Sequence, residues 1–330
     1  MKENHVKAAF ILFITAVITC SAFYFSLLDI WQEKIFDAFF TKKSAPNTIV
    51  IFAIDNESIA KVGQWPWQRG VFADAINKLQ SAKIIGIDVN FSEPSAINPQ
   101  GDFLFARAME NSKPGVILPV QTRVATKEKT QPLEIFKDHS LSGSVDIIYT
   151  DSSARTVQNI QEDGESFGAV AALAQNPDLA MPTVMRIDYA GPQNTFLTLP
   201  IIDLLENKVP DHIYKNAIVL IGATAPDLHD YLQTPLGLLP GVEIHANIIN
   251  TILGQRFYRP FPLWASLLAI LFFNALAALV IINAKKIFWL VSGLAGIAAL
   301  INIMAMVLFS QKIVFPVLYV NLGFLATSRG

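Results

Sequence analysis

The sequence has a single cysteine, Cys20, among its 330 residues. Cys20 lies in an uncharged apolar run near the N-terminus, so the rest of the chain cannot be cross-linked by disulfides. Small secreted domains often depend on disulfides, but a segment of about 200 residues buries enough apolar surface to be stable without them. We therefore expect the more polar part of the chain to be stabilised by its own hydrophobic core.

Short catalytic motifs are also lacking. The sequence contains no Walker phosphate loop, no Gly-x-Gly-x-x-Gly, no Cys-x-x-Cys and no Gly-x-Ser-x-Gly. Its formal net charge is −2 and it has no run of basic residues, so nucleic acid is not expected as a partner. We expect a chain that is not an enzyme and has no catalytic residue, metal or cofactor.

Long apolar runs are present instead, and hydrophobic residues make up 52% of the chain. Run 8–28 has no charge and, at about 1.5 Å per helical residue, is long enough to cross a hydrocarbon core of about 30 Å. The alternative is a cleaved signal peptide, but bulky Phe23, Tyr24 and Phe25 occupy the place of its cleavage site. We interpret the run as a retained membrane helix.

Three further apolar runs lie near the C-terminus. Runs 261–283 and 287–309 are uncharged and long enough to span a membrane. Run 313–326 is uncharged too, but as a helix it would reach only about 21 Å, which is short of the bilayer core. We expect this fourth span to be cut off by the end of the sequence.

Basic residues beside these runs predict their orientation, because cytoplasmic loops retain lysine and arginine. Lys2 and Lys7 precede the first run, Lys285 and Lys286 separate the second from the third, and Arg329 follows the fourth. Both termini are therefore predicted to lie in the cytoplasm.

The sequence thus predicts three parts in an inner (plasma) membrane protein. These are a cytoplasmic N-terminus with the first membrane helix (1–28), an extracytoplasmic, periplasmic domain (29–260) and a C-terminal membrane bundle (261–330). Membrane lipid is accordingly the first expected partner.

An amphipathic helix is predicted directly after the first membrane run. Trp31, Ile35 and Phe39 recur at four-residue spacing with Phe36 and Phe40 beside them, whereas the polar Gln32, Glu33 and Lys43 face elsewhere. This helix either packs in a core or acts as a lever between the membrane helix and the domain.

A βαβ unit follows. The apolar runs 49–54 and 84–87 each end in an aspartate, Asp55 and Asp88, and the helical pattern 71–80 separates them. Connections of this length favour parallel strands, and continuously apolar strands indicate a sheet buried on both faces.

The remaining pattern completes an α/β domain with a mostly parallel sheet flanked by helices, beside an α-helical membrane bundle. Helices are predicted at 103–110, 166–175, 200–206 and 242–253, strands at 116–120, 184–189 and 217–221, and a loop or excursion at 121–140.

A ligand site is expected at the carboxyl ends of the parallel strands, where Asp55, Asp88 and Gly222 lie and Thr224 follows. The alternative for Asp55 is a helix N-cap. Asp88 could similarly brace the turn at 90–93.

A second group of candidates follows the first strand. Trp67 and Arg69 bring an aromatic face and a guanidinium to that loop, which suits an anionic or aromatic ligand. The structural alternative is that Trp67 packs in the domain and Arg69 pairs with an internal carboxylate, for which Asp55 and Asp88 are the expected partners.

Asp227, His229, Asp230 and His245 have side chains that bind divalent ions or transfer protons. Their spacing matches no compact metal motif. The favoured interpretation is a surface loop for Asp227 and His229, and capping or hydrogen bonding for Asp230 and His245.

Taken in order, a series of short segments resembles a known family. They are Asp55 with Ser58, Gly63, Trp65-Pro66-Trp67-Gln68-Arg69, Gly86-Ile87-Asp88-Val89-Asn90-Phe91, Asp102, Ile218-Val219-Leu220-Ile221-Gly222, Asp230, Thr234-Pro235 and Pro240-Gly241-Val242-Glu243-Ile244-His245-Ala246. The chain resembles CHASE-type sensory domains of the second type over nearly its whole length. The resemblance implies one membrane helix, an extracellular sensor and three further membrane helices. Family members usually continue into a cytoplasmic nucleotide cyclase, histidine kinase or other kinase, which implies signalling without naming a ligand.

Three functional hypotheses follow. The first is a receptor input with an unknown extracytoplasmic ligand or protein partner, and the second is a dimerisation or assembly module without a small ligand. The third is a periplasmic enzyme that uses Asp55, Asp88 and His245. A homodimer is expected under the first two, because cyclase and kinase effectors generally act as pairs. The predicted ligand-binding residues are Asp55, Trp67, Arg69, Asp88, Gly222, Thr224, Asp230 and His245.

Overall fold

A computed structural model describes residues 2–96, 98–122, 128–162 and 164–329. The chain forms two compact units. We call Thr41–Phe257 the α/β unit, and Met1–Phe40 together with Tyr258–Gly330 the helical unit.

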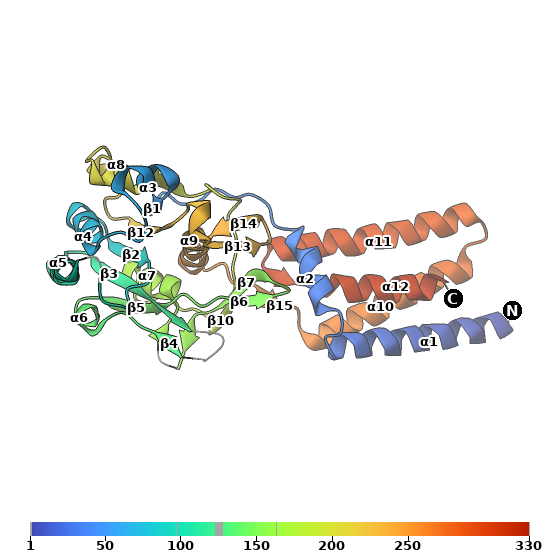
Figure 1. Ribbon diagram of the computed structural model, residues 1–330. Coiled ribbons are helices and arrows are strands. Elements are labelled where there is room, and N and C mark those ends of the chain that lie inside the picture. Colours follow the sequence, from blue (N-terminus) through green and yellow to red (C-terminus); the bar gives the residue numbers. More distant parts are fainter. Residues whose placement is uncertain (1, 97, 123–127, 163, 330) are drawn as a thin grey trace. The chain divides into compact units, whose positions relative to one another are not determined.

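A mostly parallel sheet forms the centre of the α/β unit, as the sequence predicted (Figure 1). Its strands are, in spatial order, β11 (Leu197–Pro200), β1 (Ile49–Ile54), β12 (Ile218–Ala223), β2 (Ile84–Asp88), β3 (Gly115–Thr122) and β4 (Lys129–Thr130), with β5 (Leu141–Ser144) also paired to β3. Only the β3–β4 pair is antiparallel. Strands β1 and β2 run in the same direction, but β12 lies between them, so the βαβ unit skips one strand position.

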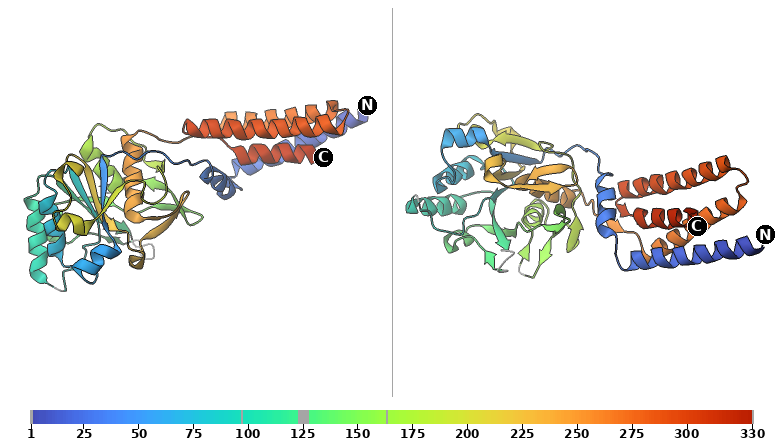
Figure 2. Two further views of the ribbon diagram at one scale, coloured as in Figure 1. Left: turned by 90° about the horizontal axis from the view of Figure 1, so that it is seen from above. Right: turned by 45° about the vertical axis from the view of Figure 1, so that its right-hand side comes forward.

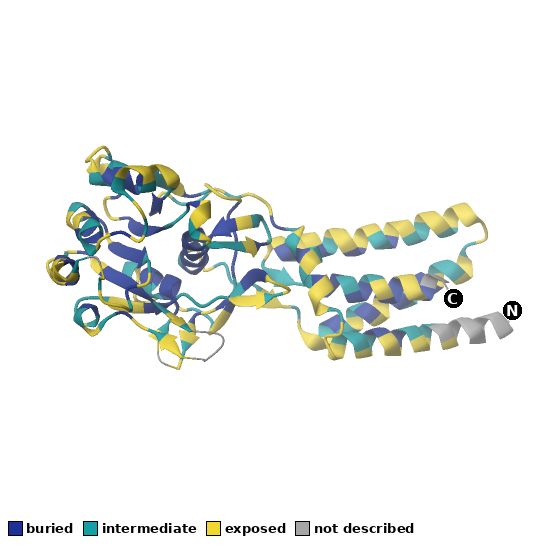
Figure 3. Cartoon of the chain, in the orientation of Figure 1, coloured by how far each residue is buried: buried dark blue, intermediate teal, exposed yellow. Residues whose placement is uncertain are grey.

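Helices cover both faces of this sheet, which explains why its strands are continuously apolar (Figures 2 and 3). One face carries α3 (Asn56–Val62), α4 (Arg69–Lys78), α5 (Pro99–Glu110), α6 (Glu134–Lys137) and α8 (Ile201–Leu205), and the other carries α7 (Phe167–Gln175) and α9 (Gly241–Leu253). Val50 and Phe52 point into the core beneath the first group. Gly86 faces Phe167 of α7 instead, since a Cβ at Gly86 would lie 2.8 Å from that ring.

Smaller β elements surround the edge of the sheet. They are a three-stranded sheet of β10 (Val184–Arg186), β7 (Ser153–Gln158) and β6 (Ile148–Thr150), and the pairs β8 (Ile160–Gln161) with β9 (Gly164–Glu165) and β13 (Tyr231–Thr234) with β14 (Gly237–Pro240). The strand predicted at 184–189 therefore ends early. The predicted loop at 121–140 contains β4 and α6, and its residues 123–127 lie outside the described part of the chain.

The helical unit consists of α1 (Lys2–Tyr24), α2 (Asp29–Asp37), α10 (Leu263–Asn283), α11 (Ile287–Ser310) and α12 (Val317–Arg329), with a short pair of strands, β15 (Arg259–Pro260) and β16 (Ile313–Val314). Among the described residues, α10 and α11 are long and apolar enough to cross a membrane. Leu12–Tyr24 and Asp29–Asp37 form a third candidate, bent by 80°. The side chains of residues 1–9 and 11, within or before the first predicted span, lie outside the description.

Two sequence predictions for the helical unit need correction. The fourth run opens as strand β16 and becomes helical only at Val317. The predicted apolar face of α2 is confirmed only in part, because Phe36 and Phe40 are buried, whereas Trp31 is 62% exposed and Gln32, expected to face elsewhere, is buried. Phe36 stacks on Phe309 of α11 with ring centroids 5.7 Å apart, so packing within the unit selects the neighbouring stripe.

Close packing of α7 on α9 gives a first test. A Cβ at Gly168 of α7 would lie 2.4 Å from Cγ2 of Ile248. We expect Gly168→Ala to lower the free energy of unfolding by about 1–3 kcal/mol, as overpacking does. Urea unfolding of the purified chain in neutral detergent, followed by tryptophan fluorescence, measures this change.

Gly70→Ala is the matched control. Gly70 lies in α4 with no atom within 4 Å of its Cβ position, so alanine should be neutral or stabilise by up to about 1 kcal/mol. Equal urea midpoints for Gly168→Ala and the unsubstituted chain would contradict the close α7–α9 contact.

Candidate functional site

A cavity of about 240 Å³ lies at the carboxyl end of β2. Its polar lining consists of Asp88, Asn90, Gln121, Tyr149, Asp230 and His245. Its other lining residues are Pro119, Val145, Ile147, Leu232, Gly241 and Ile244. The cavity therefore lies at the edge of the sheet where parallel α/β proteins bind ligands, as predicted.

Asp88 brings a carboxylate to this cavity from the last position of β2. Its side chain is 13% exposed, and Oδ2 lies 3.7 Å from Nε2 of His245. Within the described ranges, no lysine or arginine forms an ion pair with Asp88. Burial raises the pKa of Asp88 to about 7, because removal from water disfavours the charged form.

Asp230 adds a second carboxylate from the segment that precedes β13. Its backbone oxygen accepts a hydrogen bond from the Gly241 N–H at 3.0 Å. A Cβ at Gly241 would lie 2.7 Å from Oδ2 of Asp230, so this approach requires glycine. Burial, followed by repulsion from Asp88, raises the pKa of Asp230 to about 7.

His245 enters the cavity wall from the second turn of α9. The residue is 4% exposed, and burial lowers its pKa to about 4, so the ring is neutral at pH 7. Its ring centroid lies 5.0 Å from that of Phe167. Nδ1 is buried and makes no hydrogen bond.

Tyr149 and Gln121 are site residues that sequence reasoning missed. Tyr149 belongs to β6, and burial followed by the charges of Asp230 and Asp146 raises its pKa. Gln121 is near the end of β3, where the sequence suggested a loop. Neither belongs to a motif, so only the folded chain brings them to the cavity.

Two predicted site residues have structural roles away from the cavity. Asp55 caps α3, and its Oδ1 accepts a hydrogen bond from the Ser58 N–H at 2.8 Å. Arg69 pairs with an internal carboxylate, as the structural alternative predicted, but the expected partners Asp55 and Asp88 were wrong. Arg69 Nε lies 3.2 Å from Oδ1 of Asp102, because Arg69 begins α4 and packs against α5.

Three other predicted residues do not line the cavity either. Trp67 is 4% exposed and donates from Nε1 to the Gly63 carbonyl at 2.9 Å, which agrees with the packing interpretation. Gly222 lies inside β12 beside Asp88, where a Cβ would approach that of Val242 to 2.7 Å. The Thr224 N–H donates to the backbone of β1.

Metal binding finds no support in the described part of the chain. No group of three or more histidine, cysteine, aspartate or glutamate side chains there is placed to hold an ion. Asp227 and His229 are exposed in a short loop, as the favoured interpretation predicted.

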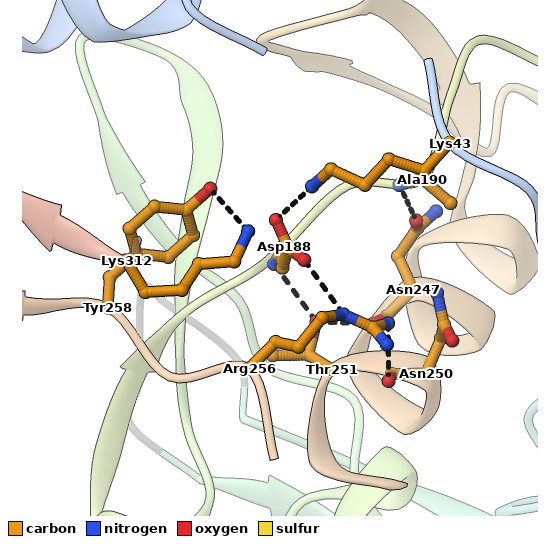
Figure 4. A network of polar contacts seen from close by, with 9 residues as sticks. All are labelled: Lys43, Asp188, Ala190, Asn247, Asn250, Thr251, Arg256, Tyr258 and Lys312. Atoms are coloured by element: carbon orange, nitrogen blue, oxygen red, sulfur yellow. Dashed lines mark hydrogen bonds and ion pairs between the residues drawn. The ribbon is translucent and has the colours of Figure 1, made fainter. Parts of the chain in front are cut away.

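A second polar feature of the α/β unit surrounds Asp188, whose side chain is fully buried (Figure 4). Oδ1 accepts from Nζ of Lys43, and Oδ2 lies 2.9 Å from Nε of Arg256. The Asp188 N–H donates to the hydroxyl of Thr251 on α9 at 2.9 Å. We call these four residues the Asp188 network. It joins the first residues of the α/β unit to its last ones, because Lys43 lies near its start and Arg256 near its end.

Helix α9 connects the cavity with the Asp188 network. Its first turns supply Gly241, Ile244 and His245 to the cavity. Its later turns supply Asn247, which accepts from the Ala190 N–H at 2.8 Å, and Thr251. The sequence offered one overlooked signal for the network, a single aspartate within the strand-like pattern 184–189.

The raised pKa of Asp88 predicts a change of stability with pH. An unfolded aspartate titrates near pH 4, whereas folded Asp88 keeps its proton up to about pH 7. Between these values the folded state binds more protons, so the stabilising contribution of Asp88 falls as pH rises and is level above 7. The free energy of unfolding of Asp88→Asn, relative to that of the unsubstituted chain, should therefore increase from pH 4 to 7 and then stay constant.

Urea unfolding of the full chain at several pH values measures this difference, and Asp230→Asn should behave alike. His245 contributes a pH dependence of the opposite sign to the free energy of unfolding. This contribution is present in the variant and in the unsubstituted chain, so it largely cancels when their free energies of unfolding are subtracted. Asp227→Asn is the matched control, because Asp227 is exposed. A difference for Asp88→Asn that does not vary with pH would contradict a raised pKa.

Comparison with known families gives one match. A family model described as the CHASE2 domain matches residues 11–281, which is most of the chain. No curated protein and no solved structure matches.

Proposed function

Because the chain belongs to the CHASE2 domain family, we propose that it is the input of a transmembrane receptor that relays an extracytoplasmic stimulus to a cytoplasmic effector. CHASE2 domains are sensory extracellular domains of signalling receptors. The stimulus binds in the cavity beside Asp88, and α9 transmits the change.

The observation that carries this proposal is the double role of α9. Its N-terminal turns form part of the cavity wall, and its C-terminal turns hold the Asp188 network. Lys43 of that network lies on the chain segment between α2 and β1, and Arg256 lies on the segment between α9 and α10. A shift of α9 therefore acts on both segments at once.

Such a relay requires a difference in affinity. A stimulus changes the equilibrium between two states only by as much as it binds one of them more tightly. A shift from 1% to 99% of the signalling state needs a difference of about 5.5 kcal/mol. The carboxylates of Asp88 and Asp230 are removed from water, where charges interact more strongly than in bulk solvent. Contacts between the stimulus and these two carboxylates are a suitable source of this free energy.

The proposed receptor lies in the inner membrane with residues 29–260 in the periplasm. Helices α1, α10 and α11 cross the membrane, the shorter α12 runs back toward the cytoplasmic side, and both termini are cytoplasmic, as the positions of lysine and arginine favour. The receptor acts as a homodimer, and its effector is a nucleotide cyclase or a histidine or other protein kinase. This chain itself is not an enzyme.

Two rival functions receive less support. The enzyme hypothesis needed Asp55 to join Asp88 and His245, but Asp55 caps α3. The assembly hypothesis is favoured by the buried packing of Trp67. It gives no role, however, to the open cavity beside Asp88.

The relay predicts that the Asp188 network controls both chain segments together. Asp188→Asn removes the charge that holds Lys43 and Arg256, and each such charge-assisted contact contributes about 1.5–3 kcal/mol. Amide hydrogen exchange should therefore accelerate at least about tenfold in both 41–48 and 254–257. The measurement uses the full chain in lipid nanodiscs with detection by mass spectrometry.

Asp203→Asn is the matched control, since Asp203 faces Lys208 at 3.6 Å on the surface and should leave both segments unchanged. The cavity is then perturbed by Asp230→Asn, which should alter exchange in the two segments when Asp188 is present and much less in Asp188→Asn. Acceleration confined to one segment, or no effect of Asp230→Asn, would contradict transmission through α9.

The effector proposal has a direct test in the gene. We expect the reading frame to continue beyond the codon for Gly330 into a cyclase or kinase domain. Sequencing the genomic DNA from the codon for Val317 onward decides this point. A stop codon directly after Gly330 would contradict an effector on the same chain.

A further inference from the structure

We propose that the cavity beside Asp88 binds a small organic cation, whose ammonium group lies between the carboxylates of Asp88 and Asp230. The role of this ligand as a stimulus rests on the proposed function, whereas its binding does not.

The first argument is the charge of the cavity. Asp88 and Asp230 contribute two carboxylates, and its lining contains no lysine or arginine. The titratable neighbours of Asp88 are Asp230 and His245, and His245 is neutral at pH 7. Buried carboxylates are stable when a cation or several donors accompany them. A ligand with an ammonium group supplies the cation that the lining does not.

Other buried carboxylates of the α/β unit show the contrast. Asp102 pairs with Arg69, and Asp188 pairs with both Lys43 and Arg256. Glu243 of α9 accepts from the Asn194 N–H at 3.0 Å. Cationic side chains thus neutralise Asp102 and Asp188, whereas Asp230 of the cavity, like Glu243, has a backbone N–H beside it, that of Gly241, and the cavity lining contains no lysine or arginine.

The second argument is the state of His245. This residue is 4% exposed and lines the cavity, yet its Nδ1 makes no hydrogen bond. Its Nε2 lies 3.7 Å from Oδ2 of Asp88, which is beyond hydrogen-bonding distance. A donor group placed beside Asp88 would find an acceptor in a neutral imidazole, as well as in the carboxylates.

The remaining lining limits the size and type of the cation. Val145, Ile147, Leu232 and Ile244 offer apolar contacts to a short hydrocarbon portion. A volume of about 240 Å³ is below the range of about 300–1,000 Å³ that drug-sized ligands occupy. Within the described residues, the acidic and histidine side chains are not arranged to hold a metal ion, which favours an organic cation.

Protons compete with such a ligand. The titratable groups that face the cavity are Asp88, Asp230, His245 and Tyr149, with Asp146 near Tyr149. The two aspartates lose their protons near pH 7, and only their charged forms attract an ammonium group. Affinity should therefore rise as pH increases from 6 to 8.

Isothermal titration calorimetry on the full chain in neutral detergent tests the proposal. The probes are ethylamine, butylamine and 1,4-diaminobutane, with 1,4-butanediol and succinate as neutral and anionic molecules of matched length. We expect at least one amine to bind, at least about tenfold more tightly at pH 8 than at pH 6, and neither matched molecule to bind measurably. Absence of binding by all three amines, or equal binding of the diol, overturns the proposal.

Substitutions locate the binding site. Asp88→Asn and Asp230→Asn should each weaken amine binding at least tenfold, whereas Asp227→Asn, on the exposed loop, should not change it. Thermal unfolding confirms that each variant is folded, and if one is not, the probe series in the unsubstituted chain decides the proposal alone. Equal weakening by Asp227→Asn would assign the amine to general surface charge and overturn the site.

Hydrogen exchange in 41–48 and 254–257, measured with and without the bound amine, tests the cation site and the proposed relay separately. Binding without any change in exchange supports the cation site and contradicts the relay. No amine binding, together with a change of exchange in Asp230→Asn, overturns the cation site and supports the relay.

Discussion

Helix α9 is buried on every side from Gly241 to Ile252, although it carries five polar side chains in that length. Because a polar group removed from water is costly unless it is hydrogen-bonded, the surroundings of α9 must supply partners. The backbone N–H groups of Asn194, Ala190 and Asp188 do so for Glu243, Asn247 and Thr251, respectively, whereas Nδ1 of His245 makes no hydrogen bond. The position of α9 is therefore fixed by directional contacts as well as by apolar packing, and the segments around it are arranged to meet them.

Glycine residues make this burial possible. Gly168 of α7 and Gly222 of β12 each lie where a Cβ would collide with a branched side chain of α9, Ile248 and Val242 respectively. Gly241, at the start of the helix, allows the carboxylate of Asp230 to approach. The same close packing that buries α9 thus brings its first turn against the carboxylates of the cavity.

Much of this fold follows from local sequence. The runs 49–54, 84–87 and 217–221 predicted buried strands, and the aspartate after the second run lies at the carboxyl end of β2, as its position predicted. The insertion of β12 between β1 and β2 could not be predicted, because strand order depends on contacts far apart in the chain. Asp55 and Asp88 show what a local pattern leaves undetermined, because each ends an apolar run in the sequence. Asp55 accepts from the Ser58 N–H and caps α3, whereas Asp88 lines the cavity.

Partners of charged side chains were the least predictable part of the site. Arg69 selects Asp102 because α4 and α5 pack together, and Asp188 meets Lys43 and Arg256 only when the two ends of the unit converge. These pairs also explain why the two halves of α9 differ. Beside its C-terminal half, the buried carboxylate of Asp188 is paired with Lys43 and Arg256. Beside its N-terminal half, no lysine or arginine lines the cavity, so the charge of Asp88 and Asp230 depends on the protons that they hold, and this is the end of α9 on which the proposed stimulus acts.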